Sequence, residues 1–155
     1  MRKRIKKICS KSSGFTLVEL IVVIAILGLL ATIGLSSFRT SQIKGRDSQR
    51  KNDLAQIQRA LELYYNDHQQ YPLSGEFPGG GGIWDDDEGT LYMKEVPEDP
   101  KFGGYPYDST DGSYYKIYAR LENENDPAIN PGGYSGIVCG DDDCNYGVSS
   151  ENAIL

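Results

Sequence analysis

An almost continuous apolar run extends from Phe15 to Leu35, a length of 21 residues. At about 1.5 Å of rise per residue, a helix of this length matches the roughly 30 Å hydrocarbon core of a bilayer. The apolar core of an ordinary secretory signal is shorter, about 7–15 residues, and ends in an Ala-x-Ala-like cleavage site. The run therefore predicts a membrane-spanning helix at residues 15–35.

The only charged residue in this run is Glu19, about one helical turn from Phe15. An ionisable side chain inside a membrane span costs on the order of 3 kcal/mol, so such residues are retained mainly for a function. The pattern therefore makes Glu19 the first candidate functional residue.

The pattern changes after the span, and residues 36–71 have the periodicity of an amphipathic helix. Apolar residues at i, i+3, i+7 and i+10 share one helical face; they are Leu54, Ile57, Leu61 and Tyr64. We predict that this stripe packs on a folded domain. The helix should end before Pro72, because proline disfavours helical geometry at the residue that precedes it. Together with the span, the segment predicts one helix of about 50 residues.

Charged residues in the second half of this helix fall largely outside the apolar stripe, so we expect them away from the packed face. They are Arg50, Asp53 and Arg59. Two pairs, Asp47 with Lys51 and Arg59 with Glu62, have the spacing of weak supporting ion pairs within a helix.

The residues after the helix predict a small antiparallel sheet. A loop rich in proline and glycine extends from Pro72 to Gly89. Two strands, Tyr105–Tyr107 and Tyr114–Leu121, flank Asp111-Gly112, a dipeptide suited to a tight hairpin turn. Alternate residues of the second strand are apolar, so one of its faces should pack on the helical stripe. With Tyr134–Val138 as a third candidate strand, the predicted fold class is α+β.

The charge of the chain is distributed unevenly. Six of the 16 basic residues lie unopposed within residues 1–14, whereas the 22 acidic residues all follow, for a net charge of −6. Removal of residues 1–14 would leave ten basic and 22 acidic residues, a net charge of −12. Phosphate contacts need a basic surface, so this composition argues against nucleic-acid binding through bulk charge.

The stretch from Ser13 to Glu19, Ser-Gly-Phe-Thr-Leu-Val-Glu, resembles the class III signal of type IV pilins and type II secretion pseudopilins. In that family a basic leader ends in glycine, phenylalanine begins the mature chain, and glutamate is its fifth residue. The resemblance implies a pilin-like fold, in which a long amino-terminal helix packs on a small antiparallel sheet. It also implies that a prepilin peptidase cleaves between Gly14 and Phe15, that Phe15 is N-methylated, and that Glu19 acts in subunit assembly.

On this interpretation the chain has four parts. They are a leader that is removed (residues 1–14), a transmembrane assembly helix (15–35), the amphipathic half of the helix (36–71) and a globular head (72–155).

A second stretch, Leu91–Pro100 followed by Gly103–Tyr107, resembles the major pseudopilins of type II secretion. Their pattern is an aromatic residue, then Leu/Val-Pro-x-Asp-Pro, then a glycine and alternating tyrosines. This chain has Lys101-Phe102 where that family usually has Trp-Gly, and its carboxy-terminal residues do not show that family's ending. The stretch therefore favours a pseudopilin, whereas the ending does not.

Three cysteines are present, and Cys9 lies in the predicted leader, so cleavage leaves Cys139 and Cys144 as a pair. A structural zinc site needs four ligands, and no other cysteine remains. We therefore predict a disulfide between Cys139 and Cys144, which forms in an oxidising compartment. The basic residues before the span favour a cytoplasmic amino terminus, and the disulfide agrees because it requires an extracytoplasmic head.

Acidic loop residues make calcium a candidate ligand, because Ca²⁺ prefers oxygen ligands; they are Asp85–Glu88, Asp108, Asp111 and Asp141–Asp143. None has the spacing of a helix-loop-helix calcium site, and a solubilising acidic surface is the alternative. Major pseudopilins often bind calcium after the Pro-x-Asp-Pro stretch, so the resemblance makes Asp108 and Asp111 the candidate ligands. No other cofactor is predicted. The only histidine, His68, has no recognisable nucleophile to activate, so no catalytic site is predicted.

These features predict a structural subunit of a type IV pilus-like filament rather than an enzyme. One alternative is the major pseudopilin of a type II secretion system, and an alternative of another class is a membrane-anchored extracytoplasmic binding domain that does not polymerise. The expected partners are further copies in a homo-oligomeric filament, other pilins or pseudopilins, prepilin peptidase, an inner-membrane assembly platform and membrane lipid. The expected location is the cytoplasmic membrane, followed by a pilus at the cell surface or a periplasmic pseudopilus.

Overall fold

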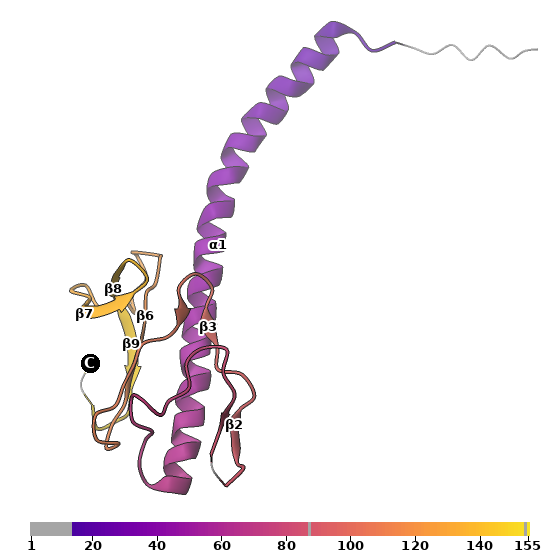
Figure 1. Ribbon diagram of the computed structural model, residues 1–155. Coiled ribbons are helices and arrows are strands. Elements are labelled where there is room, and N and C mark those ends of the chain that lie inside the picture. Colours follow the sequence, from indigo (N-terminus) through magenta and orange to yellow (C-terminus); the bar gives the residue numbers. More distant parts are fainter. Residues whose placement is uncertain (1–13, 87, 154) are drawn as a thin grey trace, which may run out of the picture. The chain divides into compact units, whose positions relative to one another are not determined.

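The computed structural model describes residues 14–86, 88–153 and 155. The chain forms two compact units, Met1–Thr40 and Ser41–Leu155, and helix α1 (Leu17–His68) runs through the boundary between them (Figure 1). Nine short strands follow α1 among the described residues, all in antiparallel pairs. They are β1 (Trp84–Asp85), β2 (Leu91–Met93), β3 (Glu98–Asp99), β4 (Gly103–Gly104), β5 (Tyr107–Asp108), β6 (Lys116–Ala119), β7 (Tyr134–Cys139), β8 (Asp142–Cys144) and β9 (Tyr146–Ser149). This arrangement confirms the predicted α+β fold.

Helix α1 ends at His68, three residues before the end of the predicted segment 36–71. Gln69 has a φ of 57°, a left-handed conformation that commonly follows the last turn of a helix. Its backbone N–H donates to the carbonyl oxygen of Tyr65 at 2.8 Å, which satisfies one carbonyl of the last turn. As predicted, the helix ends before Pro72.

The predicted apolar stripe of α1 forms one side of the core of the second unit. Leu54, Ile57 and Leu61 are fully buried, and the partly buried Tyr64 packs against the same cluster. The other side of the core comes from β1, from β6 and from the loops, through Tyr71, Trp84, Val96, Tyr105, Tyr115, Ile117 and Ala119. The predicted alternation within residues 114–121 is confirmed, because the apolar positions from Tyr115 to Leu121 are at most 2% exposed.

The main sheet has the strand order β5-β6-β9. Strands β5 and β6 form a hairpin that includes Gly112, whose φ of 74° matches the turn predicted at Asp111-Gly112. The third strand of this sheet is β9, in which Val148 pairs with Ile117. The predicted third strand, Tyr134–Val138, is present as β7, but it pairs with β8 in a separate hairpin.

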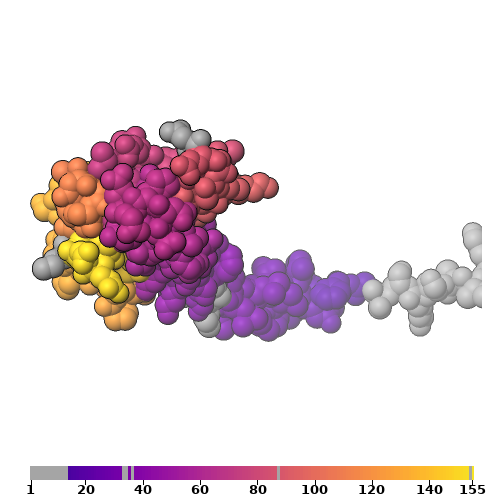
Figure 2. All heavy atoms as spheres, turned by 90° about the horizontal axis from the view of Figure 1, so that it is seen from below, coloured from indigo at the N-terminus to yellow at the C-terminus, as the bar shows by residue number. Residues whose placement is uncertain are grey.

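The predicted loop from Pro72 to Gly89 contains a strand, contrary to expectation. Trp84 of β1 is 3% exposed and pairs with Met93 of β2. Its indole ring lies 5.6 Å from the ring of Tyr64 on α1, between ring centroids. Burial of this ring therefore holds part of the loop against the helix. The β1–β2 hairpin and the main sheet lie on opposite sides of the second half of α1 (Figures 1 and 2).

The expectation that charged residues lie away from the packed face of α1 is wrong for two of them. Arg50 is fully buried and Asp53 is 6% exposed, where it accepts a hydrogen bond from the hydroxyl of Tyr105 at 2.8 Å. Burial raises the pKa of Asp53, although the bond from Tyr105 acts in the opposite direction. Only Arg59 is exposed as predicted.

Neither of the two predicted ion pairs within the helix is present among the described side chains. Lys51 pairs with Asp126 at 2.6 Å. Glu62 accepts hydrogen bonds from the hydroxyl groups of Tyr71 and Tyr115. In both cases a partner in the head replaces the partner one turn away.

Candidate assembly site

The first unit exposes its apolar side chains. Every residue from Gly14 to Thr40 whose exposure the structure describes is exposed. An 18-residue window of α1 has a mean hydropathy of 2.7, and none of it is buried within the protein. By length and composition this part of the helix can cross a membrane. Such a surface is stable only when lipid or other apolar helices cover it.

Glu19 and Thr16 form a reciprocal cap at the start of α1. The backbone N–H and the hydroxyl of Thr16 donate to Oε2 of Glu19 at 2.9 and 2.7 Å. In return, the backbone N–H of Glu19 donates to Oγ1 of Thr16 at 3.2 Å. This is a capping box, and the carboxylate also lies at the positive end of the helix dipole. In the single subunit Glu19 therefore has partners within its own helix.

Thr16 is a functional candidate that the sequence analysis missed. Thr-x-x-Glu before an apolar run is the pattern of a capping box, so the signal was present in the sequence. Its hydroxyl both donates to and accepts from Glu19, which fixes the position of the carboxylate beside the start of the helix.

The predicted cleavage site lies in an exposed segment just before α1. Gly14 and Phe15 precede the first helical residue, Leu17, and a Cβ atom at Gly14 would have no neighbour within 4 Å. The side chain of Phe15 is 76% exposed. Exposed, non-helical chain is the form that proteases cleave most readily. Cleavage and methylation here stay predictions, and the rest of the leader, residues 1–13 with Cys9, lies outside the described residues.

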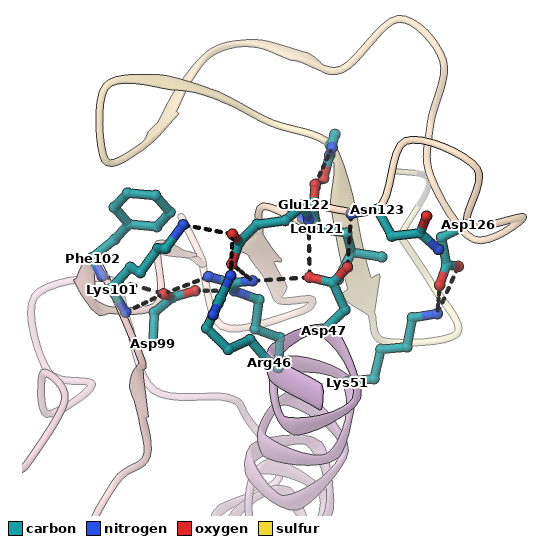
Figure 3. A network of polar contacts seen from close by, with 12 residues as sticks. Arg46, Asp47, Lys51, Asp99, Lys101, Phe102, Leu121, Glu122, Asn123 and Asp126 are labelled. Atoms are coloured by element: carbon teal, nitrogen blue, oxygen red, sulfur yellow. Dashed lines mark hydrogen bonds and ion pairs between the residues drawn. The ribbon is translucent and has the colours of Figure 1, made fainter. Parts of the chain in front are cut away.

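A network of buried charges connects the second half of α1 to the head (Figure 3). Arg50 is its centre and has no exposed side-chain surface. Its guanidinium donates to Asp99 through Nε at 2.6 Å and Nη2 at 3.0 Å. Nη1 donates to Asp47 at 2.9 Å and to Glu122 at 2.8 Å. Three carboxylates from three separate segments therefore share one guanidinium.

The remaining bonds of the network satisfy the backbone where the head meets the helix (Figure 3). Asp47 accepts the backbone N–H groups of Glu122 and Asn123 at 2.9 and 2.8 Å. Asp99, the aspartate of the Pro-x-Asp-Pro stretch, accepts the N–H of Lys101 at 2.8 Å and thereby fixes the turn between β3 and β4. The aspartate of this motif therefore has a structural role, because it links its own turn to α1.

Glu122 is surrounded by cations. Arg46 donates to it through two nitrogens, both at 2.7 Å, and Lys101 donates at 2.5 Å. The hydrogen bonds from Arg46 outweigh the effect of burial and, with those from Lys101 and Arg50, lower the pKa of Glu122 far below its usual value. Burial alone would lower the pKa of Arg50, but its bonds to the carboxylates raise it. Both groups are therefore charged at neutral pH.

Cys139 and Cys144 form a disulfide across the β7–β8 hairpin, as predicted. Cys144 is fully buried and Cys139 is 6% exposed, and both pack against Tyr118. Tyr118 lies on the face of β6 opposite the main core, where the hairpin buries it to 3% exposure. The disulfide therefore belongs to a second, smaller core.

The two candidate calcium ligands are not brought into a metal site. In the part of the chain that the structure describes, no three His, Cys, Asp or Glu side chains are grouped so that they could hold a metal ion. Asp108 lies in β5, and Asp111 accepts the N–H and hydroxyl of Ser113 at 3.0 and 2.6 Å. These hydrogen bonds from Ser113 lower the pKa of Asp111.

Known proteins are similar to this chain at its amino terminus and over much of its length. A family model described as "Prokaryotic N-terminal methylation motif" matches residues 9–35. "Type II secretion system core protein G" of Pseudomonas aeruginosa is 31% identical over 107 residues, which cover 63% of this chain and 73% of that protein. The protein of the same name from Aeromonas hydrophila is 28% identical over 125 residues, 69% of this chain and 79% of that protein. No solved structure gives a significant match.

A pilin is similar over a shorter stretch. "Type IV major pilin protein PilA" of Myxococcus xanthus is 31% identical over 68 residues, which cover 44% of this chain and 31% of that protein. The methylation motif, the exposed apolar helix and the small antiparallel sheets are consistent with both groups of relatives. The chain belongs to the family of type IV pilins and type II secretion pseudopilins.

Proposed function

We propose that this chain is the subunit of a type IV pilus-like filament, assembled from the membrane through α1 after a prepilin peptidase has removed residues 1–14. The observation that carries the proposal is the apolar surface of the first unit, where every residue whose exposure the structure describes is exposed. Lipid covers this surface before assembly. In a filament, the helices of other copies replace the lipid, since packing between apolar helices is favourable in both settings.

Glu19 gives the assembly its register in this proposal. Cleavage after Gly14 creates a positively charged α-amine on Phe15, and a carboxylate and an amine that are both close to hydrocarbon are each costly alone. The carboxylate of an incoming copy neutralises the amine of a copy already in the filament. The cap from Thr16 supports this role, because it satisfies the carboxylate while the subunit waits in the membrane.

The disulfide supports an extracytoplasmic head. Cys139 and Cys144 are paired and almost fully buried, and such bonds form and persist in oxidising compartments. With one span in α1, the amino terminus then lies in the cytoplasm, where the prepilin peptidase and an inner-membrane assembly platform act on the subunit.

The second candidate is the major pseudopilin of a type II secretion system. Two observations favour it. The relatives from Aeromonas hydrophila and Pseudomonas aeruginosa named for that system are matched over 79% and 73% of their length, whereas the pilin is matched over 31% of its length. The Pro-x-Asp-Pro stretch also supplies the buried Asp99 that fixes the head to α1. The pilus and the pseudopilus use the same subunit chemistry, so the proposal differs only in where the filament forms.

Shearing cells that make the chain distinguishes these functions. A pilus subunit is recovered in the sheared filament fraction, and deletion of its gene leaves protein secretion unchanged. A pseudopilin instead stays with the cell at its native level, and its deletion abolishes secretion until a plasmid copy is supplied. A chain that enters no filament and affects no secretion would contradict both proposals and leave the membrane-anchored binding domain.

A further inference from the structure

An open pocket of about 570 Å³ lies where α1 ends. The half-buried rings of Tyr64 and His68 on α1 line it together with Trp84 of β1, which is only 3% exposed. Figure 2 shows this end of the second unit, with the end of α1 in magenta beside the β1–β2 hairpin in salmon. Among the described residues, the lining also contains four carboxylates and no lysine or arginine. The pocket is therefore both aromatic and negatively charged.

Two of the four carboxylates already have partners. Asp86 accepts the N–H of Thr90 at 2.7 Å and the hydroxyl of Tyr92 at 3.0 Å, and Glu76 accepts the N–H of Leu73 at 3.0 Å. The other two, Asp85 and Glu88, are exposed, and their side chains make none of the hydrogen bonds or ion pairs found among the described residues. These two acids leave uncompensated negative charge at the pocket.

The chemistry of the pocket suits the cationic end of a side chain better than a metal ion. No metal-binding group of three acidic, histidine or cysteine residues is present among the described side chains. Half-buried rings beside carboxylates instead match an ammonium or guanidinium on an aliphatic stem, because the carboxylates attract the cation and the rings cover the stem.

Within the second unit, Lys44 and Arg59 are the cations of α1 that form no ion pair with any described residue; Arg46, Arg50 and Lys51 all do. Arg59 lines a different hollow together with Glu62 and Glu151, so two acidic residues share its surroundings. Lys44 is exposed, and the acid nearest to it along the helix, Asp47, is committed to Arg50 and to two backbone N–H groups. Lys44 is therefore the cation of α1 in the second unit that has neither an ion pair with a described residue nor acidic residues in a shared hollow.

We propose that the pocket receives the ammonium group of Lys44 from a second copy of the chain when subunits assemble, an inference that rests on the proposed filament. Lys44 and His68 belong to the same helix, and their separation corresponds to about 36 Å along its axis at 1.5 Å per residue. The copy that offers the pocket is thus displaced by about this distance toward the amino-terminal end of the copy that offers Lys44. The contact is separate from that of Glu19, which lies at the start of the helix.

Cross-linking tests the contact directly. One full-length copy carries Lys44→Cys and another carries Asp85→Cys, both made in the same cell with its assembly machinery. The proposal predicts a covalent dimer in the filament fraction when a short bismaleimide is added. Each variant alone should give no dimer, and neither should Arg59→Cys paired with Asp85→Cys, which serves as the control from the same helix. Filaments without the predicted dimer would overturn the contact.

Charge reversal provides the second measurement. Lys44→Glu alone, or Asp85→Lys with Glu88→Lys, should lower the filament yield by about tenfold or more, because like charges then face each other. The combination of all three changes should recover most of the yield, whereas Arg59→Glu should leave the yield near that of the wild type. A loss caused by the pocket changes but not by Lys44→Glu would assign the pocket to another occupant and overturn the proposal.

The proposed function and the Lys44 contact can be disproved separately. If the wild-type chain enters no filament, the proposed function is wrong. If wild-type filaments form and Glu19→Ala abolishes them, while the Lys44 and pocket variants assemble normally and do not cross-link, only the Lys44 contact is wrong.

Discussion

Glu19 has one set of partners in the single subunit, and the proposal gives it another in the filament. In the structure, Thr16 satisfies the carboxylate through its backbone N–H and its hydroxyl. In the proposed filament, the α-amine of a neighbouring Phe15 satisfies it. The cap from Thr16 needs no partner chain, so it lowers the cost of placing the carboxylate of Glu19 in the membrane. During assembly the carboxylate can still exchange this cap for the amine of a neighbouring copy. A single substitution separates these two roles.

Glu19→Ala should still insert into the membrane, because it makes the span more apolar, and should still be cleaved. Its assembly should fall by about a hundredfold or more, since removing one partner of a buried ion pair costs about 3–5 kcal/mol. Glu19→Asp, one methylene shorter, should be intermediate. The measurement is the ratio of sheared to cell-associated subunit in a strain without a wild-type copy. Normal assembly of Glu19→Ala would show that the carboxylate serves only its own helix.

A bulky residue at Gly14 should block processing, because the proposed cleavage follows this residue and its Cα faces open space in the subunit. Gly14→Val should accumulate as the uncleaved chain, which a gel or an intact mass detects. Gly28→Ala is the matched control, since a Cβ atom there also meets nothing within 4 Å. Normal cleavage of Gly14→Val would contradict the predicted site.

At the scale of the elements, the sequence was most informative where the signal is local. The stripe of Leu54, Ile57 and Leu61 follows the helical period, and the residues of β6 follow the period of a strand. The hairpin at Gly112 follows from a turn that needs a positive φ. Each of these patterns lies within a few residues of the chain, so no knowledge of the partner element was needed.

The elements that were missed depend on distant partners. Strand β9 has four residues, of which Gly147 carries no side chain, and it exists because it pairs with β6 about 30 residues earlier. Arg50 is four residues before Leu54 and so lies on the same helical face as the stripe, but its charge favours a solvent-exposed position. It is buried because Asp99 and Glu122, which come from the head, both bond to it. From the sequence, ion-pair partners for such charges can be predicted only on the same helix. In the structure, partners from the head bind them instead.

Arg50→Met should destabilise the second unit by about 3 kcal/mol or more. The substitution removes the guanidinium that three buried or half-buried carboxylates share, and an unpaired buried charge is costly. Trp84, the only tryptophan and 3% exposed, reports unfolding of the detergent-solubilised chain by its fluorescence. Arg59→Met, at an exposed position on the same helix, should change stability by no more than about 0.5 kcal/mol. Equal effects at both positions would refute a central role for Arg50.

Replacing both Cys139 and Cys144 with alanine should cost about 2 kcal/mol, because the disulfide closes a short loop and removes little entropy from the unfolded chain. The effect should be local to the second core around Tyr118. Alkylation of the native head without reductant, followed by mass analysis, checks the bond itself. Two alkylated thiols in the exported chain would disprove it.

At the scale of the whole molecule, the two units differ in the kind of interaction on which each depends. The first presents an apolar helix for lipid or for other helices, whereas the second carries every acidic residue except Glu19 and depends on ion pairs where the head meets α1. The solution conditions that affect them should differ accordingly. Acid should act mainly on the second unit.

Lowering the pH below about 4.5 should progressively destabilise the second unit. The bonds from Arg46, Lys101 and Arg50 lower the pKa of Glu122, and the bond from Lys51 lowers that of Asp126. Each of these carboxyl groups therefore binds a proton at a higher pH in the unfolded chain than in the folded one. Their contribution to the free energy of unfolding is complete above the usual pKa of a carboxyl group and is lost as the pH falls toward the lowered pKa of the folded state. The raised pKa of Asp53 acts in the opposite sense but concerns one group.

Denaturant midpoints between pH 7 and pH 3, followed by the fluorescence of Trp84, measure this dependence. Glu122→Gln is the control, because it cannot titrate. The wild type should lose stability across the range, and the variant should start lower and change less. Parallel curves for the two proteins would show that Glu122 is not the group responsible.

The intact mass of the subunit recovered from sheared or overproduced filaments is the most direct test of the account. The expected mass is that of a chain that begins at Phe15 with a methylated α-amine and contains the disulfide between Cys139 and Cys144. A filament subunit that still carries Met1 to Gly14, or a chain found only as a single-span membrane protein of full mass, would contradict it.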